Sequence, residues 1–486
     1  MIKKDNYKWV ALSCTSLGAL MAVLNGTSLL IALPNIMKGL HASLSIITWV
    51  LMGYMLAMTI LVPSIGRIAD MVGRKKLYVS GFAVFTVASI LCSLSQTGLQ
   101  LLIFRILQSI GGSLLVANST SIVTDAFDKR ELGKALGING MVISVAAVIG
   151  PILGGFLVTF GGWRSIFYIN VPIGILGTIW AGIQLKETMK IPEKQKFDFL
   201  GTFVFSFGML SLLVALTLGA FGSWKNILVP VLFIIAIVLM TLFIYIENKT
   251  EQPMLDLRLF KIKIISFAYA STLLNGIARG AVTLMLTFFF QGIKGIDPLT
   301  AGMLLAPLAI AMMITSPISG YLSDKYGARI LSTVGLLISG VGLLGMMTIS
   351  ATTSTLELTI LMAIMGAGSG LFFTPNTSSV MNNVPEDKRG IAAGVRTMMN
   401  NGGNVLSIAI SMAIIASSIS PSAMQALFVG TQVGSQGIEI NQFIHGLRTA
   451  FTISLICTLA AAVMSYMRGA QPDWEEEEQK DEKVAI

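Results

Sequence analysis

The sequence predicts an all-α integral membrane protein with fourteen spans. Of its 486 residues, 54% are hydrophobic and only 12% are charged, and the mean hydropathy is +0.79. A soluble protein of this size needs roughly a quarter of its residues charged to cover its surface. The apolar runs are about 20 residues long and do not alternate with polar positions, which favours helices over a β-barrel.

The fourteen spans are predicted from windows of apolar residues long enough to cross a bilayer. These windows cover residues 9–33, 46–66, 77–96, 98–122, 135–160, 165–185, 199–219, 227–247, 264–290, 300–322, 330–350, 356–380, 390–417 and 447–467.

The distribution of lysine and arginine supports this count and predicts an orientation. If the N-terminus is cytoplasmic, 25 of the 33 basic residues fall on the cytoplasmic side, five lie outside and three lie within spans. Such asymmetry is the positive-inside signature of a multi-pass protein, and one missed span would remove it. We therefore expect a cell (plasma or inner) membrane protein with both termini in the cytoplasm. The net charge of +9 needs no nucleic-acid partner, because the membrane topology explains it.

No catalytic, metal or cofactor site is predicted. The three cysteines lie in apolar runs without CxxC spacing, and the two histidines, His41 and His445, lie in predicted outer regions. Metal chemistry favours clustered His, Cys or acidic residues. No HExxH or P-loop pattern is present, so a membrane enzyme or sensor remains only a remote alternative.

Two connections of the chain repeat one pattern. They follow the second and tenth spans and read GRIADMVGRKK (66–76) and GYLSDKYGARI (320–330). A solvated charged turn would explain either copy alone, but two copies in equivalent places indicate an internal duplication, which is how many transporters are built. The shared residues are Gly66, Asp70, Gly73 and Arg74 in the first copy, and Gly320, Asp324, Gly327 and Arg329 in the second.

The first of these patterns resembles the loop signature of the major facilitator superfamily. Of five further stretches, the first resembles the fourth-helix motif of that superfamily, the second resembles its antiporter signature in the fifth helix, and the others are similar to its fourteen-span drug:proton antiporter branch. Together the matches run from about residue 9 to 467. These stretches are LLIFRILQSIGG (101–112), VIGPILGG (148–155), GWRSIFYINVPIG (162–174) and PMLDLRLF with FFFQGIKGIDPLTAGMLLAP further on.

The resemblance implies a major facilitator fold of two six-helix bundles plus two extra central helices. The expected divisions are residues 1–190, the N-terminal bundle; 191–259, two linker spans with their loops; 260–468, the C-terminal bundle; and 469–486, an acidic cytoplasmic tail. The linker spans carry no charge in their interiors, so we expect them to be structural. The resemblance also implies that the Asp70 loop holds the two bundles together on the inner side.

Gly150, Pro151 and Gly154 in the fifth span predict a bent helix with a smooth face. Proline removes a backbone hydrogen bond, and glycine lets a neighbouring helix approach closely. Such a helix suits the seam along which two bundles rock, although small residues also favour tight packing in any bundle. With Gly66, Asp70, Gly73, Arg74 and Asp324, these positions are expected to control conformational change.

Three arginines, Arg105, Arg279 and Arg396, lie within predicted spans. A charged side chain at the bilayer centre costs roughly 2.5–3.5 kcal/mol on insertion scales, so we expect these to line a water-filled passage or to pair with buried acceptors. Gln108 and Asn400 occur in the same motifs, and together with Asn25 the set is the predicted substrate cavity.

Asn25 occupies the place in the first span where related exporters of cationic drugs carry an acid. An amide neither binds a proton near neutral pH nor neutralises a cation. Three interpretations remain open: a hydrogen bond that ties helices together, a ligand for a neutral or anionic cargo, or a proton site whose role has moved elsewhere. The predicted function is export of amphipathic small molecules, coupled to protons, with neutral or anionic cargo. An uncoupled facilitator or a lipid-moving protein is the alternative.

Overall fold

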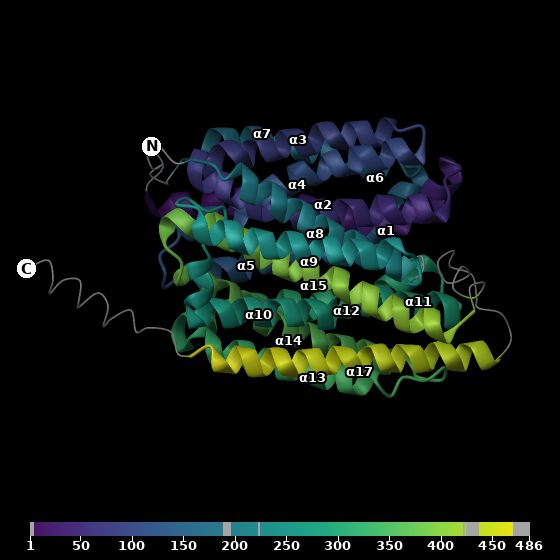
Figure 1. Cartoon of the computed structure of the whole chain (residues 1–486). Helices are drawn as coiled ribbons and strands as arrows, with labels where there is room; N and C mark the ends of the chain where they lie inside the picture. Colours follow the sequence, from purple (N-terminus) through teal and green to yellow (C-terminus); the bar gives the residue numbers. More distant parts are fainter. Residues whose placement is uncertain (1–3, 188–195, 222–223, 421–422, 424–436, 470–486) are drawn as a thin grey trace, which may run out of the picture.

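The structure, a computed structural model, describes residues 4–187, 196–221, 224–420, 423 and 437–469. Within these ranges the chain is a bundle of long helices that run side by side, with the start of α1 and the end of α17 at the same end (Figure 1). Of the predicted acidic tail, residues 470–486 lie outside the described residues.

Fourteen spans were predicted, and the described chain contains 14 helical segments long and apolar enough to cross a membrane. The helices are α1 (Lys4–Gly39), α2 (Leu44–Val72), α3 (Arg74–Leu94), α4 (Gly98–Ala126), α5 (Leu132–Gly161), α6 (Ser165–Tyr168), α7 (Asn170–Gln184), α8 (Phe199–Phe221), α9 (Leu228–Lys249), α10 (Lys263–Arg279), α11 (Val282–Phe288), α12 (Pro298–Tyr326), α13 (Ala328–Met346), α14 (Thr355–Asn382), α15 (Arg389–Ser418) and α17 (Gly437–Met467). Short 3₁₀-helices η1 (Leu257–Lys261) and η3 (Glu386–Lys388) and the π-helix η2 (Phe289–Ile293) join some of them.

Two predicted spans are interrupted helices. The sixth span consists of α6 and α7, and the ninth consists of α10, α11 and η2. In the ninth span the break follows Arg279, where the backbone passes close to α15: a Cβ at Gly280 would lie 2.6 Å from the Cα of Asn404. The hydrophobic pattern predicts the whole span because both parts are apolar, but it does not predict the break.

The helices that contact each other across the interface show the same duplication as the sequence. We call α1–α7 the N-terminal half and α10–α17 the C-terminal half. Across the two halves α2 packs on α15, and α5 packs on α12. The extra helices α8 and α9 pack on each other, and α8 also contacts α2 and α15, so this hairpin touches both halves (Figure 1).

The third residue after each acid of the repeat is a glycine with a left-handed backbone. Gly73 joins α2 to α3 with φ 105°, and Gly327 joins α12 to α13 with φ 80°. Residues with a Cβ rarely adopt this conformation. The glycine of the repeated pattern therefore makes the sharp turn between two spans possible.

Candidate functional site

The buried carboxylate of Asp70 caps a helix of the other half. Asp70 lies in the last turn of α2 and is fully buried. Its Oδ1 accepts a hydrogen bond from the Gly390 amide at 2.9 Å, and its Oδ2 accepts one from the Ile391 amide at 2.9 Å. These are among the first amides of α15, which has no side-chain cap of its own. The first amides of a helix lack partners within the helix and carry partial positive charge, so a carboxylate is stabilising there.

The second copy of the pattern makes the same contact in the opposite direction. Asp324, near the end of α12, accepts hydrogen bonds from the amides of Gly133 and Lys134 at 2.8 Å each, at the start of α5. Each half therefore supplies the carboxylate that caps a helix of the other half. The two contacts form a pair at the end of the bundle where α1 begins and α17 ends.

Glycines make this approach possible on both sides. A Cβ at Gly66 would collide with the carbonyl group of Gly390, and a Cβ at Gly390 would collide with Gly66 and with Asp70. In the second copy, Gly320 and Gly133 meet in the same way. The glycine four residues before each acid is explained by this close backbone contact.

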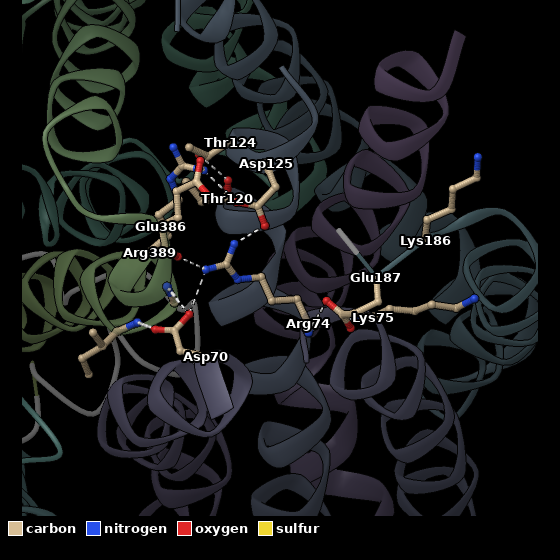
Figure 2. A network of polar contacts seen from close by, with 12 residues as sticks. Asp70, Arg74, Lys75, Thr120, Thr124, Asp125, Lys186, Glu187, Glu386 and Arg389 are labelled. Atoms are coloured by element: carbon tan, nitrogen blue, oxygen red, sulfur yellow. Dashed lines mark hydrogen bonds and ion pairs between the residues drawn. The ribbon is translucent and has the colours of Figure 1, made fainter. Parts of the chain in front are cut away.

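The two copies differ in their charges, as Figure 2 shows for the first copy. Arg74 is 2% exposed and forms ion pairs with Asp70 at 2.9 Å and with Asp125 of α4, and it also donates to the carbonyl oxygen of Glu386 at 2.8 Å. Asp125 in turn binds Arg389, the first residue of α15, at 2.9 Å. A network of buried charges thus joins α2, α3 and α4 to the start of α15.

Arg329 of the second copy lies elsewhere. Its Nε donates to the carbonyl oxygen of Tyr466 at 2.8 Å, and its guanidinium lies 4.2 Å from the centre of that ring. The arginine shared by the two sequence patterns therefore serves the inter-half contact in the first copy and the packing of α17 in the second.

The connection between α9 and α10 also reaches this contact. Lys388, directly before α15, forms an ion pair with Asp256 at 2.6 Å. Burial alone would raise the pKa of Asp256, but the hydrogen bonds from Lys388 and from the Arg258 amide outweigh it and hold the pKa below its usual value.

Sequence reasoning missed Asp125, Arg389 and the two capped helix starts. A signal was available, because the tripeptide Asp-Lys-Arg occurs at 128–130 and again at 387–389, just before each capped helix. Glu187, which follows α7, was also missed. It accepts hydrogen bonds from the amides of Arg74 and Lys75 at 3.2 and 3.1 Å and so caps α3 (Figure 2).

Three residues of the predicted cavity are joined by hydrogen bonds in the N-terminal half. Arg105 donates to Gln108 at 2.6 Å, and Gln108 donates to Asn25 at 3.3 Å. Asn170 of α7 also donates to the Asn25 oxygen, at 3.4 Å. The guanidinium of Arg105 lies 4.2 Å from the centre of the Tyr54 ring. Asn25 therefore links α1 to α4 and α7, while its own amide nitrogen is buried without a hydrogen-bond partner among the described residues.

Arg279, Arg396 and Asn400 lie in the C-terminal half. Arg396 is 7% exposed, and its guanidinium lies 5.0 Å from the centre of the Phe373 ring. Arg279 ends α10 and is half-buried, as is Asn400, one turn after Arg396 on α15. Within the described chain, no hydrogen bond joins these three to the Asn25 group.

The glycines of the fifth span face α1, and its proline faces the other half. A Cβ at Gly154 would lie 2.9 Å from the Cα of Ser28, and the Ser28 hydroxyl donates to the carbonyl oxygen of Gly150 at 3.0 Å. The Cβ of Pro151 lies 3.4 Å from the position of a Cβ at Gly302 of α12. That these residues form a rocking seam stays a prediction.

Comparison with known proteins agrees with this architecture. The family described as Major Facilitator Superfamily matches residues 15–408 and, in a second match, 268–485. The chain belongs to this superfamily and is a multi-pass membrane transporter, not an enzyme.

Among its relatives, the riboflavin transporter RibZ of Clostridioides difficile is 33% identical over 411 residues, which cover 84% of this chain and 88% of the relative. The multidrug transporter protein MdtP of Bacillus subtilis is 33% identical over 399 residues, covering 81% and 73%. In structure, the chain is similar to the proton:xylose symporter XylE, with a TM-score of 0.67, 12% identity and 95% of each chain covered.

Proposed function

We propose that this transporter is a secondary active exporter of amphipathic small molecules that works by alternating access with proton antiport. The observation that carries the proposal is the pair of contacts in which Asp70 caps α15 and Asp324 caps α5. Hydrogen bonds and ion pairs at helix ends can break and re-form within a transport cycle. The contacts close one end of the interface between the halves, as alternating access requires.

The conformational roles proposed above for the loops and for the fifth span follow from this mechanism. Gly66, Asp70, Gly73 and Arg74, together with Asp324, hold the closed end. Gly150, Pro151 and Gly154 form the face on which α5 moves. The positive-inside pattern supports a cytoplasmic position for this end and for both termini. With this end closed, the proposed transport pathway is open to the outside.

The proposed cargo is neutral or anionic. Arg105 and Arg396 are buried in spans, and none of the ion pairs in the described chain joins either to a carboxylate. Asn25 is linked to Arg105 by hydrogen bonds through Gln108. A cationic cargo would meet uncompensated positive charge there, whereas an anion or an uncharged polar group would find donors. The proposed cavity residues are Asn25, Arg105, Gln108, Arg279, Arg396 and Asn400.

The names of the relatives support an organic cargo without identifying it. One is named for riboflavin, and another at 33% identity is named for multidrug transport.

Flux in proteoliposomes tests the proposal directly. The purified chain is reconstituted with an imposed pH gradient and offered anionic, neutral and cationic amphiphiles. Gradient-driven movement of anionic or neutral compounds is expected, and it should stop when an ionophore collapses the gradient. Strong transport of lipophilic cations with none of anionic amphiphiles would contradict the charge argument.

An uncoupled facilitator or lipid-moving protein is the second candidate. It is favoured by one observation: the hydrogen-bonded group around Asn25 contains amides, a hydroxyl and a guanidinium but no carboxylate. Flux that continues unchanged after the pH gradient is collapsed would select this function over antiport.

A further inference from the structure

The carboxylates of Asp198 and Glu247 lie near each other, where the α8–α9 hairpin begins and ends. Asp198 directly precedes α8, and its Oδ1 accepts a hydrogen bond from the Gly201 amide at 2.8 Å. Glu247 lies in the last turn of α9 and is 4% exposed. Its Oε2 accepts a hydrogen bond from the Leu255 amide at 3.3 Å. One oxygen of each group is therefore used for backbone capping.

The other oxygen of each group is buried and has no hydrogen-bond partner among the described residues. Asp198 Oδ2 and Glu247 Oε1 both face Gly201, and each would lie under 3.0 Å from a Cβ at that position. Both oxygens therefore border the space that a side chain at position 201 would fill.

Two ionised carboxylates at such a place repel each other strongly, because little water screens them. A proton on Glu247 removes this repulsion and turns one of its oxygens into a hydrogen-bond donor. The field of Arg67 of α2 also reaches Glu247. Its positive charge can stabilise the single negative charge that the protonated pair retains.

The pair is connected to the contact between the halves. The Leu255 amide held by Glu247 belongs to the connection of residues 250–262. In this connection Met254 accepts a hydrogen bond from Ser64 of α2 at 3.6 Å, and Asp256 pairs with Lys388 at 2.6 Å. Lys388 lies two residues before Gly390, whose amide is capped by Asp70.

We propose that Glu247 holds a proton beside the carboxylate of Asp198 and that this pair forms a proton-binding site in the α8–α9 hairpin, which acts on the inter-half contact through residues 250–262. When the proton passes to water, the O–H bond breaks and the pair gains a second negative charge. Repulsion then separates the start of α8 from the end of α9 and loosens the connection that Glu247 holds. The site itself is independent of cargo; its part in transport rests on the proposed function.

Infrared difference spectroscopy of the purified full-length protein in nanodiscs, between neutral and alkaline buffer, tests the site without any cargo, because ordinary carboxyl groups are ionised in both buffers. The C=O stretch of a protonated carboxyl is expected in the wild type and is expected to vanish in Glu247→Gln and in Asp198→Asn. Each amide can donate to the remaining carboxylate, so the fold should be retained, and either variant suffices if the other misfolds. Glu251→Gln, an exposed position in the same connection, is the matched control and should keep the band.

A wild-type spectrum without this band, or a band that survives in the amide variants, would overturn the proposal. Hydrogen exchange provides the second measurement. After correction for intrinsic rates, amides of residues 389–392 should exchange several-fold faster at alkaline pH in the wild type and in Glu251→Gln, but not in Glu247→Gln. Equal behaviour of all three would remove the link to the inter-half contact.

The two proposals fail separately. A carboxyl band together with flux that ignores the pH gradient would reject proton antiport and keep the site. Gradient-driven flux in the wild type without the band would keep antiport and reject this site.

Discussion

Asp70 and Gly390 lie 320 positions apart in the chain, and the carboxylate of the first accepts a 2.9 Å hydrogen bond from the amide of the second. This contact places the last turn of α2 against the first turn of α15. Because Asp324 and Gly133 repeat it in the opposite direction, this end of the bundle has two similar contacts with different surroundings. The first has buried ion pairs around it, and the second relies on the capping hydrogen bonds.

Asp70→Asn is expected to reduce transport at least tenfold while leaving membrane insertion intact. The amide retains one acceptor oxygen, loses the ion pair with Arg74 and leaves that buried guanidinium partly uncompensated, a change that typically costs about 3–5 kcal/mol. Efflux from proteoliposomes, normalised to inserted protein, measures the effect. Asp324 forms no ion pair with an arginine among the described residues, so Asp324→Asn should reduce transport less. Equal transport by Asp70→Asn and wild type would contradict the proposed role of Asp70.

Gly66→Ala is expected to hold the two halves apart at this end, because the new methyl group would collide with the Gly390 backbone. Maleimide labelling of a cysteine introduced by Ile391→Cys should become several-fold faster. Gly402→Ala is the matched control on α15, since a Cβ there meets nothing within 4 Å. Equal labelling rates in the two glycine variants would show that the close approach is dispensable.

Asp125→Asn is expected to destabilise the closed end by about 2–4 kcal/mol, since Arg74 and Arg389 would share a single neutral acceptor. A double-mutant cycle with Arg389→Gln, read from thermal unfolding in detergent, should show strong coupling. Asp128→Asn, an exposed position in the loop after α4, is the control and should change little. Additive effects of Asp125→Asn and Arg389→Gln would reject the network.

The ion pair between Asp256 and Lys388 predicts a pH dependence. The folded-state pKa of Asp256 is lower than its value in the unfolded chain. Its contribution to stability is therefore complete above the unfolded pKa of about 4 and is lost as the pH falls through the lower, folded-state pKa. The difference in apparent Tm between wild type and Asp256→Asn should shrink below that range. Asp387→Asn, which is exposed, should show no such trend; a constant difference down to strong acid would refute the pairing.

Asn25→Asp is expected to change the charge preference of the cargo. The new carboxylate would lie within the hydrogen-bonded group of Gln108 and Arg105 and would offset the positive charge there. Export of lipophilic cations should rise relative to that of anionic amphiphiles. Asn139→Asp, the same change at a buried position of α5, should leave the ratio unchanged. An unaltered ratio in both variants would place Asn25 outside the cargo pathway.

Much of the fold could be predicted because the bilayer restricts each span to a form that can be recognised along the sequence alone. Every span must be long, apolar and helical, so hydropathy alone yields fourteen segments, and the repeated acid and glycines indicate the duplication. The breaks after Arg279 and before Asn170 were not predicted, because they depend on neighbouring helices and not on local composition.

By itself, the sequence determined the membrane class, the number of spans and the repeated pattern around Asp70 and Asp324, because these follow from composition and from residue spacing along the chain. Only the tertiary structure decided what these acids bind, and that Arg74 and Arg329 have different partners. The same holds for Asp198 and Glu247, which are ordinary polar residues at span ends until folding brings them together. The physical reason is that a hydrogen-bond or ion-pair partner hundreds of residues away is selected by how the helices pack, which local sequence does not specify.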